Sequence, residues 1–242
     1  MMHREASAIA VGILCKTPAA GISKTRLSPP LSPAECAEIS ACFIRDLAET
    51  VASLSGIAPF AIYTPRGSEA ALRALLPARF HLHPQVDGDF AMRVQAAFSD
   101  LLAMNPAGAI LVNSDSPTLP AAILQQAVEE TRRRDVVVLS PALDGGYTLI
   151  GLSRVHAHLF FDIPWSTPDV HRLTLERARE SSVPVVHVPD WYDVDDAQTF
   201  ELLEDELAGR PMPFAHGIAG APARHTRAFM AELTRRALRQ TF

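Results

Sequence analysis

The chain has 242 residues, of which 48% are hydrophobic and 20% are charged. This composition excludes a collagen-like chain, a disordered acidic protein and a coiled-coil rod, and it supplies enough apolar material for a core. Lys and Arg number 22 against 27 Asp and Glu, and the net charge of −5 gives no overall attraction to nucleic acid or to an anionic membrane surface. The length favours one α/β domain.

The sequence predicts a cytoplasmic protein. It has no run of 18 apolar residues, so we expect no transmembrane helix. The short apolar stretch Ala8–Leu14 is typical of a buried strand and has no small-residue cleavage site after it, which argues against a signal peptide. The cysteines are Cys15, Cys36 and Cys42, and they lack the CxxC spacing of a zinc site or a disulfide framework.

Short β-rich runs alternate with helical patterns along the chain. Strands are expected at residues 8–14, 59–63, 80–83, 109–112, 136–139, 147–152 and 184–188. Helices are expected at residues 32–51, 68–76, 89–104, 120–134, 167–182 and 195–207. This repeated alternation predicts an α/β fold with a mostly parallel sheet and helices on both faces.

The composition changes after Leu207. We expect residues 1–207 to form the domain, residues 208–223 to form a linker rich in Pro, Gly and Ala, and residues 224–242 to form a C-terminal helix with five Arg and one Glu. This helix is expected to dock on the body by its apolar face. The alternatives are an Arg-bearing flap over an anionic substrate or the arm of a homodimer.

Four polar segments follow expected strands, and the first is basic. Lys16, Lys24 and Arg26 lie in a loop that contains Gly21. Backbone N–H groups of such a loop can bind phosphates, and its cations can neutralise them. The loop contains neither GxxxxGK[ST] nor GxGxxG, so a solvated basic loop is an equal alternative.

Two further segments are acidic. Asp115 ends the fourth expected strand beside hydroxyl side chains, and it is a candidate ligand for Mg²⁺ or Mn²⁺. The alternative is an Asx turn and a helix cap. Residues 190–196 hold four acids, and Asp193 and Asp195 would project to the same side of an extended chain. One of them can complete a metal site, while Asp195 or Asp196 is expected to cap the last helix.

The remaining segment, Asp144–Tyr147, lies between two expected strands. A hairpin turn is its simpler interpretation, and a pocket wall that lets a substrate approach its glycines is the functional one. Trp165 can line the same pocket, and Thr167 before Pro168 is expected to cap a helix. Cys15 is expected to be a small buried residue rather than a reactive thiol.

Five motifs, taken in order, resemble a known family. They are KTPAAGISKTRL, NSDSPTLP, SPALDGGYTLIGL, IPWST and WYDVDDAQTFELL, and the match runs from about Ile9 to Leu207. They resemble bacterial glycosyltransferases of the nucleotide-diphospho-sugar transferase superfamily, and they are more distantly similar to 2-phospholactate guanylyltransferase. The resemblance implies a glycosyltransferase A-type, Rossmann-like fold that binds a nucleotide at the first loop, with a divalent metal bridging its phosphates.

The resemblance also implies a role for each motif. The catalytic residues would be Lys24, Asp115 and Asp144. The nucleotide and phosphate ligands would be Lys16, Gly21, Lys24, Thr25, Arg26 and Ser114. The substrate pocket would contain Gly145, Gly146, Tyr147, Trp165 and Ser166. The metal, Mg²⁺ or Mn²⁺, would be held by Asp115 with Asp193 or Asp195.

We therefore expect a metal-dependent enzyme that transfers a group from a nucleotide-activated donor to a small acceptor. The leading expectation is glycosyl transfer from a nucleotide sugar. The alternative is nucleotidyl transfer from a nucleoside triphosphate to a phosphorylated or carboxylate compound, with release of pyrophosphate. The glycosyltransferase DxD is reduced to Asn113-Ser114-Asp115 and GGxGxR is missing, which leaves the donor type open. A non-catalytic nucleotide-binding protein is the third alternative.

Overall fold

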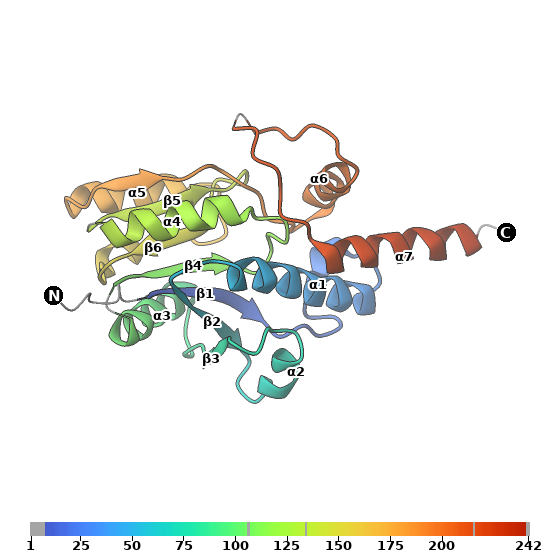
Figure 1. Cartoon of the computed structure of the whole chain (residues 1–242), viewed down its shortest axis with the longest axis horizontal. Coiled ribbons are helices and arrows are strands. Elements are labelled where there is room, and N and C mark those ends of the chain that lie inside the picture. The colour runs from blue at the N-terminus through green and yellow to red at the C-terminus, as the bar shows by residue number, and fades with distance from the viewer. Residues whose placement is uncertain (1–7, 106, 134, 215, 241–242) are drawn as a thin grey trace.

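The computed structural model describes residues 8–105, 107–133, 135–214 and 216–240, and it is built around one seven-stranded sheet (Figure 1). The strand order is β3-β2-β1-β4-β6-β5-β7. The strands are β1 (Ile9–Lys16), β2 (Ile57–Thr64), β3 (His81–Pro84), β4 (Ala109–Asn113), β5 (Val137–Pro141), β6 (Tyr147–Leu152) and β7 (Val185–His187). The helices are α1 (Pro33–Ala52), α2 (Glu69–Arg73), α3 (Phe90–Met104), α4 (Ala121–Arg133), α5 (Val170–Glu180), α6 (Ala197–Leu207) and α7 (Arg224–Gln240), with 3-10 turns η1 (Thr25–Leu27) and η2 (Ala157–Phe160).

The predicted mostly parallel α/β sheet is confirmed. Only β6 runs antiparallel to its neighbours, β4 and β5, within the sheet that the structure describes. The connection from β5 to β6 is too short for a crossover helix, so the two strands form a hairpin. Asp144–Gly146 makes the turn of this hairpin, which confirms the simpler interpretation of that segment.

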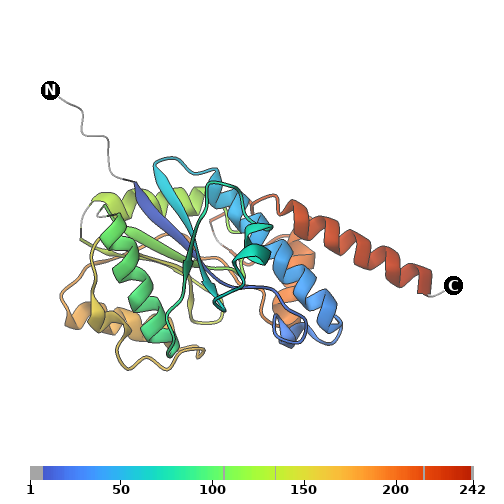
Figure 2. The same ribbon diagram turned by 90° about the horizontal axis from the view of Figure 1, so that it is seen from below.

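Helices cover both faces of the sheet, as predicted (Figure 2). Ile9, Val11 and Ile13 of β1 pack with α1, α4 and α6 in one apolar cluster. Ala10 packs with α3, η2 and α5 in the other. This alternation follows from the two-residue period of a strand, and it explains why the β1 sequence is apolar on both sides.

Side chains at the helix starts set the ends of several elements. Ser32 and Glu35 form the predicted capping box of α1. Asp196 caps α6 by accepting a hydrogen bond from the Thr199 N–H, which confirms one of the two expected caps. The expected cap at Thr167 is wrong, because α5 begins after Asp169 and the Thr167 hydroxyl instead donates to the Pro164 carbonyl at 2.7 Å.

Helix α7 lies against α1 and then projects beyond the body of the molecule (Figure 1). The buried carboxylate of Asp46 on α1 accepts hydrogen bonds from the backbone of His225 and Thr226 at 2.9 and 2.8 Å and from the Thr226 hydroxyl at 2.6 Å. Phe229 completes the contact as a buried side chain. Residues 241 and 242 of the expected helix lie outside the described residues.

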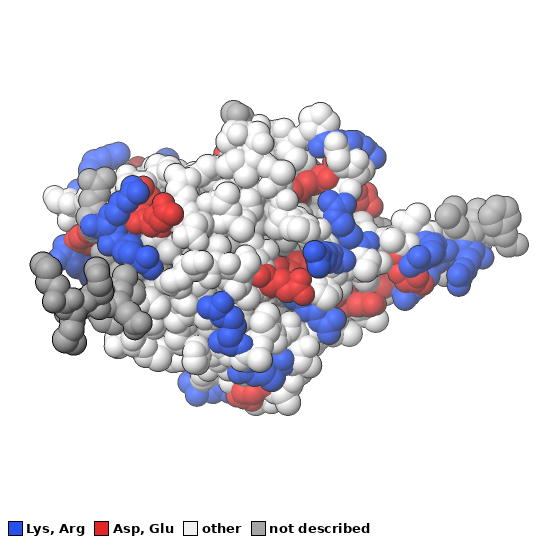
Figure 3. Space-filling view, viewed as in Figure 1, with Lys and Arg blue, Asp and Glu red and all other residues white. Residues whose placement is uncertain are grey.

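Charged groups of both signs lie along α7 (Figure 3). Arg235 and Arg236 pair with Glu232 on the same helix. Among the described residues, no helix is long and apolar enough to cross a membrane.

The Asp46 contact predicts the stability of the docked helix. Asp46→Ala leaves three donors without their acceptor, so we expect the free energy of unfolding to fall by about 2 kcal/mol. Urea denaturation of the full chain measures this change, with the exposed Glu38→Ala on the same helix as the control. Equal stability of the two variants would contradict the assigned role of Asp46.

Candidate functional site

Three of the predicted polar segments meet at the carboxyl ends of β1 and β4. The loop after β1 carries Lys24, the turn after β4 carries Asp115, and the segment after β7 carries Asp193 and Asp195. The Val194 N–H donates to the Asp115 carbonyl at 2.8 Å, which fixes two of these segments to each other through their backbones. Ligands of open α/β sheets bind at this edge.

Lys24 joins all three segments. Its ammonium group lies 2.7 Å from Asp115 and 2.9 Å from Asp195, and it donates to the Val194 carbonyl at 2.7 Å. These contacts engage all three of its donors, and only 7% of the side chain is exposed. Burial alone would lower the pKa of Lys24, but the two carboxylates raise it above its ordinary value. Lys24 therefore remains charged at neutral pH.

The backbone of Lys24 adopts a left-handed conformation, with φ at 49°. A residue with a Cβ atom rarely takes this conformation unless its surroundings hold it there. The contacts of the buried ammonium group supply that constraint.

Negative charge exceeds positive charge around this lysine. Arg26 contacts Asp195 at 2.8 Å, but its own side chain is 68% exposed. Burial, followed by the negative charges of Asp144, Asp195 and Asp115, raises the pKa of Asp193 to about 7. A cation entering the site would relieve this repulsion.

Asn113 holds the turn after β4. Its side-chain oxygen accepts from the Asp115 N–H at 3.2 Å and from the Ser116 hydroxyl at 3.0 Å. Its amide N–H group lies 3.4 Å from an oxygen of Asp193. A DxD motif would have its first acid at position 113, where this chain has Asn113, which forms an Asx turn. The Asx turn and the carboxylate of Asp115 at the site, which were alternatives, are therefore both present.

Two cavities open on either side of this group. The first has a volume of about 480 Å³ and is lined by the basic loop. Its charged lining consists of Lys16, Lys24, Arg26 and Arg93 with Asp115 and Asp195, a formal charge of +2. Thr25 and Ser114, both predicted phosphate ligands, also line it, whereas Gly21 lines neither cavity in the part of the chain that the structure describes.

The second cavity has a volume of about 470 Å³ and is bounded by the β5–β6 turn and the loop before α5. Its lining includes four of the predicted substrate residues, Gly146, Tyr147, Trp165 and Ser166. Its charged lining consists of Asp115, Asp144, Asp193 and Asp195 with Arg26, a formal charge of −3.

The two cavities share one wall. Five residues line both of them, namely Leu14, Arg26, Phe90, Asp115 and Asp195. A molecule bound in the basic cavity and another bound in the acidic cavity would therefore meet beside Asp115. This arrangement suits transfer of a group from one bound molecule to the other.

Gly145 was expected in the substrate pocket, but in the structure this glycine serves the packing of the hairpin turn. Its φ is +88°, and a Cβ atom there would lie 2.2 Å from the Pro168 carbonyl oxygen. The hairpin turn therefore packs directly on the loop before α5, and only glycine permits that approach. Gly145 is absent from the linings of the two cavities among the described residues.

Sequence reasoning missed three lining residues on the β3–α3 side. Phe90 separates the cavities, Arg93 lies 5.7 Å from its ring, and Gln85 bonds to Arg93 at 3.3 Å. The available signal was Asp89, which caps α3 and so places Arg93 in its first turn beside the sheet edge. Cys15 is buried, as expected, and it borders the first cavity; burial raises the pKa of its thiol to about 12.

The donor set fits Mg²⁺ or Mn²⁺. Asp115, Asp193 and Asp195 offer hard carboxylate oxygens, whereas the amide oxygen of Asn113 is already engaged by two donors of the turn. Burial and repulsion from neighbouring carboxylates together raise the pKa of Asp193, and a divalent cation would neutralise that repulsion. The three carboxylates are not gathered into a set with oxygens all within 4.8 Å; among described residues that spacing occurs at Asp46, Glu49 and His225, where Asp46 caps α7.

Residues 47–167, half of the chain, match the family described as "Uncharacterized protein conserved in bacteria (DUF2064)". None of the curated proteins matches it in sequence.

Solved structures share the fold over most of the chain. A candidate nucleotide-diphospho-sugar transferase from Desulfovibrio desulfuricans G20 is 25% identical, with a TM-score of 0.80, over 93% of this chain and 95% of its own. A CMP:2-keto-3-deoxy-manno-octonic acid synthetase in complex with CTP is 12% identical (TM-score 0.54; 84% of this chain, 99% of its own). A nucleotidyl transferase from Methanothermobacter thermautotroptrophicus is 14% identical (TM-score 0.53; 81% and 96%). The last two show similarity of fold alone.

The Lys24 contacts predict a loss of stability when the cation is removed. Lys24→Met leaves Asp115 and Asp195 facing each other without their shared cation, so we expect the free energy of unfolding to fall by about 2 kcal/mol at neutral pH. Denaturant titration at neutral pH measures the loss, with the exposed Lys16→Met as control. Equal stability of the two variants would rule out the ion pairs as its cause.

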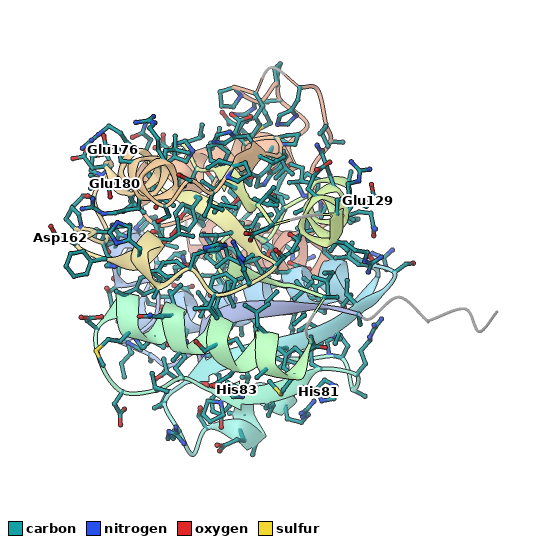
Figure 4. The ribbon with its side chains drawn as sticks, turned by 90° about the vertical axis from the view of Figure 1, so that its left-hand side faces the viewer. His81, His83, Glu129, Asp162, Glu176 and Glu180 are labelled. Carbon is teal, nitrogen blue, oxygen red and sulfur yellow. The ribbon has the colours of Figure 1, made fainter. Side chains whose placement is uncertain are left out.

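The raised pKa of Asp193 predicts a gain of stability when this residue is replaced by the neutral asparagine. The carboxyl loses its proton near pH 4 when unfolded and near pH 7 when folded, so it weakens the fold increasingly between those values. Asp193→Asn should therefore raise Tm in metal-free buffer at pH 8, by about 2–4 °C for each kcal/mol recovered, and much less at pH 4. Asp162→Asn is the control, since Asp162 is 81% exposed on the outer surface near Glu176 and Glu180 (Figure 4). A gain that does not depend on pH would contradict the assignment.

Proposed function

This chain belongs to the DUF2064 family of bacterial proteins, and we propose that it is a metal-dependent transferase that moves a sugar from a nucleotide sugar to a small acceptor. The observation that carries the proposal is the pair of adjoining cavities, one basic and one acidic and aromatic, that share Asp115 in their common wall. Its fold, shared with the 25% identical structure, is that of nucleotide-using transferases, which supports the general class.

The basic cavity suits the nucleoside diphosphate part of the donor. Lys16 and Arg26 are exposed cations at the start and the end of the basic loop, and Arg93 of α3 lines the same cavity. Their guanidinium and ammonium groups can bind phosphate oxygens and stabilise the charge that develops on the leaving diphosphate. Lys24, already engaged by three acceptors, would hold Asp115 and Asp195 in place beside that group.

A divalent cation bound by Asp115 with Asp193 or Asp195 would supply further stabilisation of negative charge on the diphosphate. Asn113 keeps Asp115 directed toward the shared wall through the Asx turn. The second cavity has four carboxylates and, among its described lining residues, one basic side chain, Arg26, which supports a requirement for an added cation there.

The acidic cavity suits hydroxyl groups of a sugar and an acceptor. The acceptor oxygen would attack the anomeric carbon, the bond from that carbon to the diphosphate would break, and the hydroxyl proton would pass to a carboxylate. Asp144 is our candidate base, because it is exposed in this cavity and the Gly146 N–H fixes its side chain at 2.8 Å.

Nucleotidyl transfer is the second candidate, and one observation favours it. The first cavity carries four cations, and the turn after β4 offers one carboxylate where a glycosyltransferase DxD would offer two. A triphosphate would use this excess of positive charge better than a diphosphate. In that reaction an acceptor oxygen attacks the α-phosphorus and pyrophosphate leaves.

Removal of one carboxylate tests the proposal. Asp115→Asn keeps the shape of the side chain and removes its charge, so we expect turnover to fall by roughly 10²–10³. Phosphorus NMR of mixtures with Mg²⁺ and a panel of nucleotide sugars and nucleoside triphosphates measures it, with Asp162→Asn as control. Release of a nucleoside diphosphate supports glycosyl transfer, and pyrophosphate establishes the second candidate instead. Full turnover by Asp115→Asn would contradict both assignments of this residue.

A further inference from the structure

The second cavity lacks the groups that bind anions. Its only basic side chain among the described lining residues is Arg26, which is already paired with Asp195. Four carboxylates face or border the same space, and Asp144 and Asp193 belong to this cavity alone. Even one divalent cation would leave the lining with a negative charge.

Aromatic groups form another part of the lining. Phe90 and Trp165 meet edge to face with ring centroids 4.8 Å apart, and Tyr147 adds a third ring. Aromatic faces bind the C–H surfaces of sugars and attract cations, so this part of the lining favours a sugar or a ligand with an ammonium group.

We propose that the second cavity selects a polyhydroxylated acceptor that is neutral or carries an ammonium group, and that it excludes acceptors bearing phosphate or carboxylate. This inference rests on the proposed function, since it names the acceptor class of that site. Carboxylates accept hydrogen bonds from hydroxyl and ammonium groups, whereas an anion placed there would face a lining of formal charge −3. The basic cavity beside it provides the contrast, because anions are attracted there.

Matched sugars test this selection. We would record saturation-transfer NMR with glucosamine, glucose and glucose 6-phosphate on the full chain with Mg²⁺. Inorganic pyrophosphate in every sample would occupy the basic cavity, so that the phosphorylated sugar cannot bind there. We expect glucosamine and glucose to give signals, with glucose 6-phosphate at least about tenfold weaker. This difference should narrow at high salt, where charges are screened.

Asp144→Asn shows whether the carboxylate is the cause. The side chain is exposed and its amide oxygen can still accept from the Gly146 N–H, so the turn should keep its shape. We expect the preference for glucose over glucose 6-phosphate to shrink severalfold in this variant and to stay unchanged in Asp162→Asn. Trp165→Ala should weaken all three signals.

Two binding results would overturn the proposed acceptor selection. They are tighter binding of glucose 6-phosphate than of glucose, and no signal from any of the three sugars. A preference that Asp144→Asn leaves unchanged would overturn the electrostatic cause. The proposed function fails separately, if no nucleotide or nucleotide sugar binds or turns over while the sugar preference holds.

Discussion

The contact of Lys24 with Asp115 and Asp195 is the constraint on which the rest of the site depends. It joins the loop after β1, the turn after β4 and the segment after β7, which are far apart in the sequence. A buried ammonium group is stable only when acceptors surround it. The three segments must therefore be correctly placed relative to one another before the lysine can be buried. The same contact places two carboxylates in the wall between the cavities.

The carboxyl edge of the sheet has one basic and one acidic cavity because different segments lie on the two sides of that wall. The basic loop and α3 bring cations to one side, and the β5–β6 hairpin brings Asp144 and Tyr147 to the other. The hairpin can do so because β6 is inserted antiparallel between β4 and β5. One topological exception in a parallel sheet therefore creates the second cavity.

Much of this architecture could be predicted because it depends on local signals. The Ser32 capping box, the apolar run of β1 and the alternation of strands and helices each follow from short-range chemistry. The pairing of β6 with β4, the contact of Lys24 with Asp195 and the presence of Arg93 could not, because they depend on strand order and on contacts between distant residues. The predicted cap at Thr167 was wrong for a local reason, since its hydroxyl donates to the Pro164 carbonyl within the turn before α5.

Calorimetric titration of a nucleotide with Mg²⁺ into the wild-type chain and into Asp115→Asn measures whether this carboxylate helps to bind a nucleotide with its metal. We predict binding of at least one nucleotide sugar or nucleoside triphosphate that depends on Mg²⁺ and is weakened by the substitution, at about 1.4 kcal/mol for each tenfold loss in affinity. Binding that is equal with and without Mg²⁺ and unaffected by Asp115→Asn, or no binding by any nucleotide in the panel, would contradict it.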